Sequence, residues 1–258
     1  MKKKWILAVV TVLFVGTTTS YYFIQKKRTY DLISPKVGPI TEAIYGLGTV
    51  TSKDKFSFKV GVPKTIRSLY VREGQQVEKG EKILQFDDET VIKSPFRGTV
   101  FSLPYHIGEN VFTDRAVVEI ENVHQLYIDT ILDQQSSMRV KKLDPVKISF
   151  ETIENRFFSG QVTALYHSNS NFIARVEAAD LPKNILPGMT ADIAIEVAQK
   201  ESALLIPARA VQHGQVLIER NNKRMKVTVT LGLMDQEWVE VTSGTIQPDD
   251  LILLKKVL

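Results

Sequence analysis

The sequence predicts a mainly β protein that follows an N-terminal transmembrane helix. Three observations lead to this prediction. Short runs of alternating apolar and polar residues fill most of the chain after residue 40, one stretch repeats itself, and a single long apolar run lies at the N-terminus. Alternation with a period of two is the pattern of strands with one buried face. The length of 258 residues predicts one or two compact domains.

Residues 61–122 contain the repeat, whose two copies match without a gap after a shift of 34 positions. Gly74 and Gly108 favour tight turns because glycine adopts positive φ at little cost, and Gly80 with Asp114 marks a second matched turn. Each copy alone buries little apolar area, so the repeat predicts a small β sandwich in which two interlocked halves share one core. The matched apolar pairs are Ile66 with Val100, Leu69 with Leu103, Val77 with Val111, Ile83 with Val117 and Phe86 with Ile120.

The apolar run spans Trp5–Ile24 and contains no charged residue. As a helix, these 20 residues would extend about 30 Å, which is the thickness of the hydrocarbon core of a bilayer. We interpret residues 1–30 as an uncleaved membrane anchor. A cleavable signal peptide is the alternative, although Thr18 and Ser20 match a cleavage site only partly. Basic residues flank both ends equally, so charge alone does not decide the orientation.

Charge and cysteine content exclude several classes of protein. Six of the 33 basic residues flank the apolar run and all 29 acidic residues follow it, so the body has a net charge of −2 although the whole chain has +4. The body therefore lacks the basic excess of a nucleic-acid-binding protein. Because the chain has no cysteine, it has no disulfide, thiolate metal site, cysteine nucleophile or lipidated cysteine.

Residues 123–198 predict a second β region, because short alternating runs there are separated by polar, glycine or proline turns. This spacing is typical of a small barrel or sandwich. One short helix is expected within residues 134–143, with Ser136 or Ser137 near its start. The sequence Leu186–Ala191 places proline and glycine at the central positions of a type II turn before the last strand.

Residues 204–258 are nearly all strand by the same criterion, and Asn221-Asn222 predicts a hairpin turn between two of these strands. Residues 31–39 are polar and contain proline, and we interpret them as a tether between the anchor and the β body.

No motif for catalysis or metal binding is present in the sequence. The four histidines are far apart in sequence and lack metal-ligand spacing. The sequence contains no Gly-x-Ser-x-Gly, Walker or His-Glu-x-x-His motif. The acidic run Asp87-Asp88-Glu89 is interpreted as a solvated turn rather than a cation site. We therefore expect no enzyme activity, no metal and no cofactor.

The repeat resembles the two halves of a biotinyl/lipoyl domain, on the segments VGVPKTIRSLYVREGQQVEKGEKILQFDD and IKSPFRGTVFSLPYHIGENV. The resemblance implies the motif's turn glycines at Gly74, Gly80, Gly98 and Gly108. Such domains occur as swinging-arm carriers and as structural modules of periplasmic adaptors. A carrier needs a lysine at the exposed tip, where this chain has about Asp87 and where Lys93 lies off the tip. The structural module is therefore favoured.

Beyond the repeat, the order of motifs over almost the whole body resembles the membrane fusion proteins, also called periplasmic adaptors or HlyD-type proteins. These motifs include FFSGQV, LPGMTADIAI, LLIPARAV, VTLGL, WVEVTSG and DDLIL. The resemblance implies nested β modules. It places a membrane-proximal domain at 31–50 and 203–258, a β-barrel at 51–60 and 123–202, and a lipoyl-like domain at 61–122.

One departure from that family concerns the long α-helical hairpin that usually splits the lipoyl domain and reaches an outer-membrane channel. Only the five residues Glu89–Lys93 lie at this place. A helical arm of about 30 residues would extend about 45 Å, whereas five residues can only turn. Contact with an outer-membrane channel is therefore doubtful.

The resemblance implies a non-catalytic adaptor subunit of an inner-membrane efflux or secretion transporter, of the RND or ABC type. It implies a single-pass protein of the inner membrane with its body in the periplasm and with self-association into a ring. Transporter contacts or self-contacts are expected near Pro187, Gly188 and Met189 and at Asn221 and Asn222. Two alternatives remain open: a structural or assembly protein of the envelope with the adaptor fold, and a tethered lipoyl or biotinyl carrier.

Overall fold

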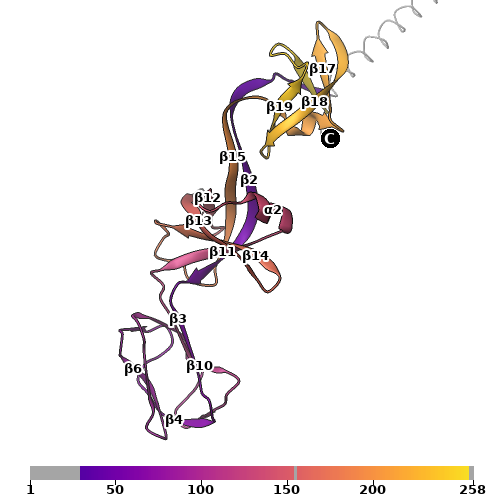
Figure 1. The fold of residues 1–258 in the computed structure, drawn as a ribbon. Coiled ribbons are helices and arrows are strands. Elements are labelled where there is room, and N and C mark those ends of the chain that lie inside the picture. The colour runs from indigo at the N-terminus through magenta and orange to yellow at the C-terminus, as the bar shows by residue number, and fades with distance from the viewer. Residues whose placement is uncertain (1–29, 154–155, 256–258) are drawn as a thin grey trace, which may run out of the picture. The chain divides into compact units, whose positions relative to one another are not determined.

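The computed structural model describes residues 30–153 and 156–255 and is built almost entirely of β-strands (Figure 1). The expectation of a mainly β protein is therefore confirmed. The expected anchor at residues 1–30 falls almost wholly outside the described residues. No helix within the described ranges is long and apolar enough to cross a membrane.

The chain folds into two compact units. Among the described residues, one unit lies within Ile44–Val197, and the other comprises residues 30–43 together with residues 198–255. Strands β2 (Lys36–Ser52) and β15 (Thr190–Pro207) supply residues to both units. Every strand pair with a recorded register is antiparallel, so the units consist of hairpins and long returns rather than βαβ crossovers.

Within the unit of residues 44–197, the repeat forms a sandwich of two four-stranded sheets. The expected two-half architecture is present: a shift of 34 residues carries each strand of one sheet onto a strand of the other. One sheet has the order β3 (Lys55–Lys59), β10 (Ala116–Glu121), β8 (Gly98–Ser102) and β5 (Gln76–Val77); the other has β7 (Val91–Lys93), β6 (Lys82–Phe86), β4 (Lys64–Leu69) and β9 (Asn110–Val111).

The two halves of the sandwich exchange their short edge strands. Val77 of β5 pairs with Gly98 in the second half, and Val111 of β9 pairs with Lys64 in the first half. The amides of Gly74 and Gly108 donate to the carbonyls of Val100 and Ile66, both at 2.8 Å. Because each half supplies a strand to the other half's sheet, neither half completes its sheet alone.

The core of the sandwich is apolar and fully enclosed, with Phe86 as the largest side chain that has no exposed surface. Phe56 and Phe58 of β3 pack against this core. The family resemblance implied that residues 51–60 belong to the barrel, and for β3 this was wrong because β3 pairs with β10. The physical reason is that the alternation of β3 does not show which sheet edge the strand will pair with.

Gly74, Gly80 and Gly108 adopt positive φ, as expected of turn glycines. Gly98 does not: it begins β8 and is buried inside the sheet. A Cβ at Gly98 would lie 2.8 Å from the carbonyl oxygen of Glu121. The assignment of Gly98 as a turn glycine was therefore wrong, because this glycine allows close packing of strands rather than a reversal of the chain.

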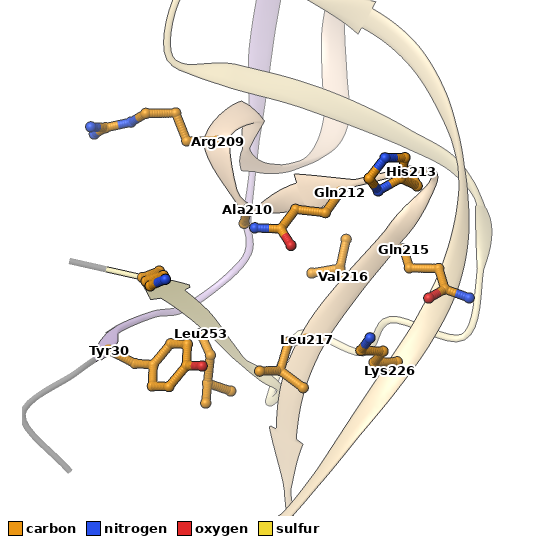
Figure 2. Close-up of a pocket in the computed structure, with 11 residues that line it drawn as sticks. Tyr30, Arg209, Ala210, Gln212, His213, Gln215, Val216, Leu217, Lys226 and Leu253 are labelled. Carbon is orange, nitrogen blue, oxygen red and sulfur yellow. The ribbon is translucent and has the colours of Figure 1, made fainter. Parts of the chain in front are cut away.

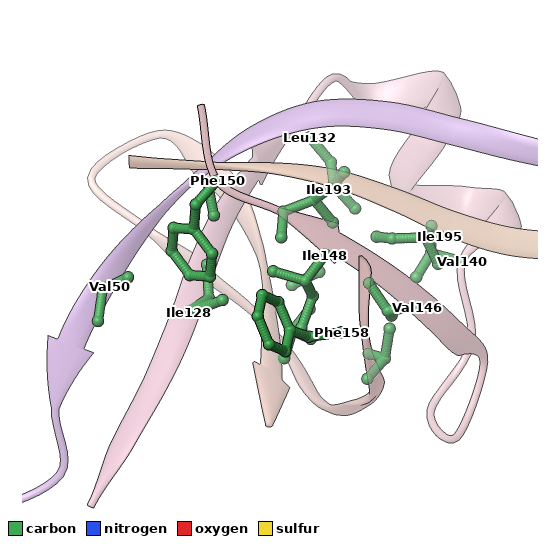
Figure 3. Packing of buried hydrophobic residues seen from close by; sticks show 14 of the residues in the cluster. Val50, Ile128, Leu132, Val140, Val146, Ile148, Phe150, Phe158, Ile193 and Ile195 are labelled. Carbon is green, nitrogen blue, oxygen red and sulfur yellow. The ribbon is translucent and has the colours of Figure 1, made fainter. Parts of the chain in front are cut away.

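The second part of the same unit is a closed six-stranded antiparallel barrel, as one reading of residues 123–198 predicted. Its order is β15, β12, β13, β14, β11 and β2, and a further pairing of β2 with β15 closes the ring. Figure 3 shows the enclosed core, in which Phe150 and Phe158 meet edge to face with ring centroids 6.0 Å apart. Besides β2 and β15, the barrel contains β11 (Leu126–Leu132), β12 (Pro145–Ser149), β13 (Phe157–Ser168) and β14 (Asn171–Ala178).

The expected short helix is α2 (Gln134–Arg139), which follows β11. Asp133 caps its N-terminus by accepting a 2.7 Å hydrogen bond from the amide of Ser136. The two serines lie inside the first turns of the helix, so the position was right and Asp133 is the capping residue.

In the remaining unit the strands follow the order β1, β20, β17, β18, β19 and β15, and β15 continues the pairing into the barrel strand β12. The core of this unit is a separate apolar cluster that includes Ile206, Val216, Ile218 and Ile252. A short 3₁₀ turn, η1 (Ala208–Ala210), and β16 (Val211–Gln212) lead from β15 to β17. The strands are β1 (Tyr30–Ile33), β17 (Gln215–Arg220), β18 (Lys223–Met234), β19 (Trp238–Gly244) and β20 (Leu251–Lys255).

The interpretation of residues 31–39 as a tether was wrong. Residues 30–33 form β1, which pairs along its whole length with β20 near the other end of the chain, and residues from Lys36 onward belong to β2. A polar segment can form an edge strand when a distant strand supplies its hydrogen-bond partners. The sequence of residues 31–39 alone does not show that β20 will be that strand.

Candidate contact surfaces

Pro187, Gly188 and Met189 form the turn that precedes β15 in the barrel. Gly188 has a φ of +89°, and the amide of Met189 donates to the carbonyl of Leu186 at 3.2 Å, which is the geometry of the expected type II turn. Two further backbone hydrogen bonds of 2.9 Å join this turn to Val50 of β2. Leu186 remains 47% exposed beside it. The turn is thus held rigidly while one apolar side chain faces solvent.

Asn221 and Asn222 form the two-residue turn between β17 and β18, in the other unit. Both have positive φ, at +51° and +61°, and the flanking residues Arg220 and Lys223 are directly paired. This is the hairpin turn that the sequence predicted, and positive φ at both central residues is the pattern of a type I′ turn, because asparagine tolerates the left-handed region better than most residues. Both side chains are exposed, so the turn presents two amides to solvent.

Replacing Asn221 or Asn222 by alanine is expected to lower the free energy of unfolding by about 1–2 kcal/mol, because a Cβ-bearing residue without a compensating side chain is strained at positive φ. Asn222→Gly is the matched control at the same position, since glycine adopts this backbone conformation freely. Urea unfolding of the variants measures the difference. Equal stability of Asn222→Ala and Asn222→Gly would contradict the turn geometry.

The tip of the lipoyl-like sandwich is the hairpin of residues 87–90 between β6 and β7. The amide of Phe86 donates to the carbonyl of Thr90 at 2.9 Å, which closes the turn within a few residues. Asp87 and Asp88 are exposed at the tip, where a carrier domain would present a lysine. Lys64 of β4 forms an ion pair with Asp88, so the nearest amine is engaged, and Lys93 lies at the far end of β7. The tip therefore lacks the free amine that a lipoyl or biotinyl amide requires.

Lys64, which donates to the Asp88 carboxylate, lowers the pKa of Asp88 to about 2, with smaller contributions from Thr90. We expect Lys64→Met to raise this pKa toward the ordinary aspartate value of about 3.9, while the hydrogen bonds from Thr90 still hold it lower. Carboxyl-carbon NMR titration measures it directly. Arg67→Met is the control, because Arg67 pairs with Glu89 at 3.4 Å rather than with Asp88. An unchanged Asp88 pKa in Lys64→Met would disprove the pair.

A polar network on the outside of the barrel was not found from the sequence. Arg175 of β14 forms a bidentate pair with Asp129 of β11, with nitrogen–oxygen distances of 2.9 and 3.1 Å. Tyr166 donates to Asp129 at 2.8 Å, and the guanidinium of Arg175 lies 3.7 Å from the centre of the Tyr127 ring. The pair with Asp129 raises the pKa of Arg175, whereas burial and then Asp129 raise the pKa of Tyr166.

The network joins three adjacent strands, since Asp129 lies directly opposite Arg175 and Tyr166 comes from β13. Its groups satisfy one another, so it stiffens the barrel wall rather than offering a reactive site. The only signal in the sequence was opposite charge at outward positions of two strands, and such positions become neighbours only after the register is known.

In the ranges that the structure describes, no group of three or more histidine, aspartate or glutamate residues is arranged to hold a metal ion. The predicted contact residues do not form one constellation: the Pro187–Met189 turn belongs to the barrel, and the Asn221-Asn222 turn belongs to the other compact unit. Their chemistry is that of rigid turns that display backbone and amide groups.

The chain combines a lipoyl-like sandwich, a closed six-stranded barrel and a further β unit, and both the barrel and the further unit contain strands from before and after the sandwich. This is the fold of the membrane fusion proteins, or periplasmic adaptors. Among solved structures, the chain is similar to MacA from Actinobacillus actinomycetemcomitans, with a TM-score of 0.73 and 16% identity over 88% of this chain and 100% of that chain. The resemblance predicted from the sequence motifs is thus confirmed at the level of fold.

Two further solved structures are similar to the chain. A MacA–MexA chimera that contains the Pseudomonas aeruginosa MexA α-hairpin domain gives a TM-score of 0.68 and 18% identity, over 83% of this chain and 97% of that chain. The membrane fusion protein Spr0693 from Streptococcus pneumoniae R6 gives 0.50 and 10% identity, over 60% of this chain and 99% of that chain. No family model and no curated protein matches the sequence.

Proposed function

We propose that the chain is a non-catalytic adaptor subunit of an efflux or secretion transporter of the inner membrane. The observation that carries this proposal is the similarity of fold to MacA over 88% of the chain. In this role the protein docks on the extracytoplasmic face of the transporter, associates with further copies of itself, and helps to form the export conduit. The transporter, of the ABC or RND type, supplies the energy.

The chemistry of the sandwich supports a structural role for it. With Asp87 and Asp88 at the tip and Lys64 paired to Asp88, the hairpin offers no free amine for a covalent cofactor. Intact-mass spectrometry of the purified full-length protein checks this. We expect the mass of the unmodified polypeptide, and a lipoyl or biotinyl adduct would replace the adaptor proposal with the carrier alternative.

We further propose that residues 1–30 anchor the chain in the inner membrane, that the body lies in the periplasm, and that residues 31–43 and 198–255 form the membrane-proximal domain. The placement of residues 44–50 in that domain was wrong, because the end of β2 pairs with β11 of the barrel. The tight hairpin at residues 87–90 closes with a 2.9 Å hydrogen bond between Phe86 and Thr90. A turn of this length cannot extend as a helical arm would, so the proposed complex reaches any outer-membrane channel through another component.

The proposal is tested by purification of the full-length protein from membranes in mild detergent after cross-linking. We expect an inner-membrane transporter and further copies of the chain to co-purify. Recovery of a monomer without a transporter would contradict the proposal, and normal export after deletion of the gene would favour a structural role in the envelope.

The contact role of the hairpin turn is tested by a double variant, Asn221→Gly with Asn222→Gly, which keeps the turn and removes its amides. We expect recovery of the transporter to fall several-fold. Asn169→Gly with Ser170→Gly is the matched control, because these residues form the equivalent positive-φ turn between β13 and β14. Equal recovery from both double variants would show that the Asn221-Asn222 turn is not a contact.

A further inference from the structure

The unit that contains β1 and β20 has a hollow of about 380 Å³ beside β17 (Figure 2). Its walls come from four places: η1 and β16, the hairpin of β17 and β18, the end of β20, and Tyr30 at the start of β1. The hairpin turn His213-Gly214, in which both residues have positive φ, forms one edge. The hollow is thus assembled from segments that are far apart in sequence.

Three cations surround the hollow: Arg209, Lys226 and Lys255. All three side chains are exposed, and none forms an ion pair with any residue that the structure describes. No carboxylate lines the hollow, and the nearest one on the same face of the hairpin, Glu219, is paired with Arg224 at 3.3 Å. The hollow therefore carries uncompensated positive charge, which favours an anion.

The floor of the hollow is apolar. Leu253 is almost completely buried there, and Leu217 of β17 lies directly opposite Lys226 of β18. The Tyr30 ring closes one side, opposite Lys255 in the strand register. A cationic rim over an apolar floor suits a ligand that carries a phosphate and an adjoining apolar part, because bare phosphate gains nothing from the floor.

The position of Tyr30 in the sequence indicates that the ligand comes from the membrane. This inference rests on the proposed membrane anchor. The apolar run ends at Ile24, so only five residues separate it from Tyr30. Even fully extended, this distance is at most about 20 Å. The hollow must therefore lie close to the headgroups of the bilayer in which the anchor is embedded.

We propose that this hollow, which Arg209, Lys226 and Lys255 line, binds the phosphate headgroup of an anionic phospholipid, with Leu217 and Leu253 beneath the glycerol and the first acyl carbons. The contact would orient the membrane-proximal sheet against the bilayer surface. The arrangement combines charge attraction with apolar contact, as lipid-binding surfaces do.

The test uses the full-length protein in a non-ionic detergent and titrates it with dihexanoyl phosphatidylglycerol, with native mass spectrometry as the readout. We expect one saturable lipid, with weaker binding at higher salt. The triple variant Arg209→Gln, Lys226→Gln, Lys255→Gln is expected to bind about tenfold more weakly or worse. Arg72→Gln, Lys79→Gln, Lys142→Gln is the matched control, because it removes the same charge from exposed positions in the other unit.

Three results would overturn the proposal. They are an equal loss of binding in the control variant, equal binding of dihexanoyl phosphatidylcholine, and saturation by inorganic phosphate at the same concentration, which would indicate a site for soluble phosphates. If the triple variant does not fold, the single variants Arg209→Gln and Lys226→Gln replace it. The titration needs no transporter, so its outcome is independent of the co-purification that tests the adaptor role.

Discussion

Replacing Asp250 by asparagine is expected to lower the free energy of unfolding of its unit by about 1–3 kcal/mol, because the change removes the charge of a buried carboxylate that pairs with the partly buried Arg220. Asp250 is 1% exposed and accepts hydrogen bonds from Arg220 Nε at 2.7 Å, from Arg220 Nη2 at 2.8 Å and from the amide of Gln247 at 2.8 Å. Asparagine keeps the volume but removes the charge. Urea unfolding followed by hydrogen exchange of β17 and β20 measures the effect.

The matched control in the same unit is Glu219→Gln, which breaks the more exposed pair with Arg224. Exposed pairs contribute about 0–1 kcal/mol, so this variant is expected to stay close to the parent protein. If Asp250→Asn and Glu219→Gln lose equal stability, the buried pair does not hold β17 and β20 together as the geometry indicates.

The same pair gives the unit an acid-sensitive stability. Arg220, followed by the amide of Gln247, holds the pKa of Asp250 below its ordinary value. A carboxyl group with a depressed folded-state pKa contributes stability above its unfolded pKa of about 3.9, and this contribution is lost as the pH falls through the folded-state pKa. The parent protein should therefore lose stability relative to Asp250→Asn below about pH 4, and a pH series of the unfolding experiment measures this.

Replacing Phe86 by alanine is expected to lower the free energy of unfolding of the lipoyl-like sandwich by about 3–5 kcal/mol, since the change removes a fully buried ring and leaves a cavity. The ring packs against Phe58, with centroids 6.2 Å apart, and lies in the core that both halves of the repeat share. Hydrogen exchange of residues 55–121 should therefore accelerate in both halves.

Phe101→Ala is the matched control, because this phenylalanine lies in the same module and is 52% exposed. Its loss should change the stability by about 0.5 kcal/mol or less. Acceleration confined to the first half of the repeat in Phe86→Ala would show that the halves fold independently, which would contradict the exchanged edge strands.

The sequence by itself determined the modules and their turns. The 34-residue repeat predicted a sandwich of two equivalent halves because its apolar positions and its glycines recur together. The turn at Gly188 and the hairpin at Asn221-Asn222 were predictable because few residues adopt positive φ easily. The conformation of a tight turn depends mainly on the residues within the turn, so these turns can be predicted from the local sequence.

Only the tertiary structure decided which distant strands pair. In the folded chain β3 belongs to the sandwich, and the segment expected to be a tether forms β1, which pairs with β20. Gly98 allows two strands to pack closely. The tertiary structure also brought Asp129 to Arg175, and Arg209, Lys226 and Lys255 around one hollow. An edge strand takes its partner from whichever backbone lies beside it after folding, so pairing and the side-chain clusters that depend on it are properties of the whole chain.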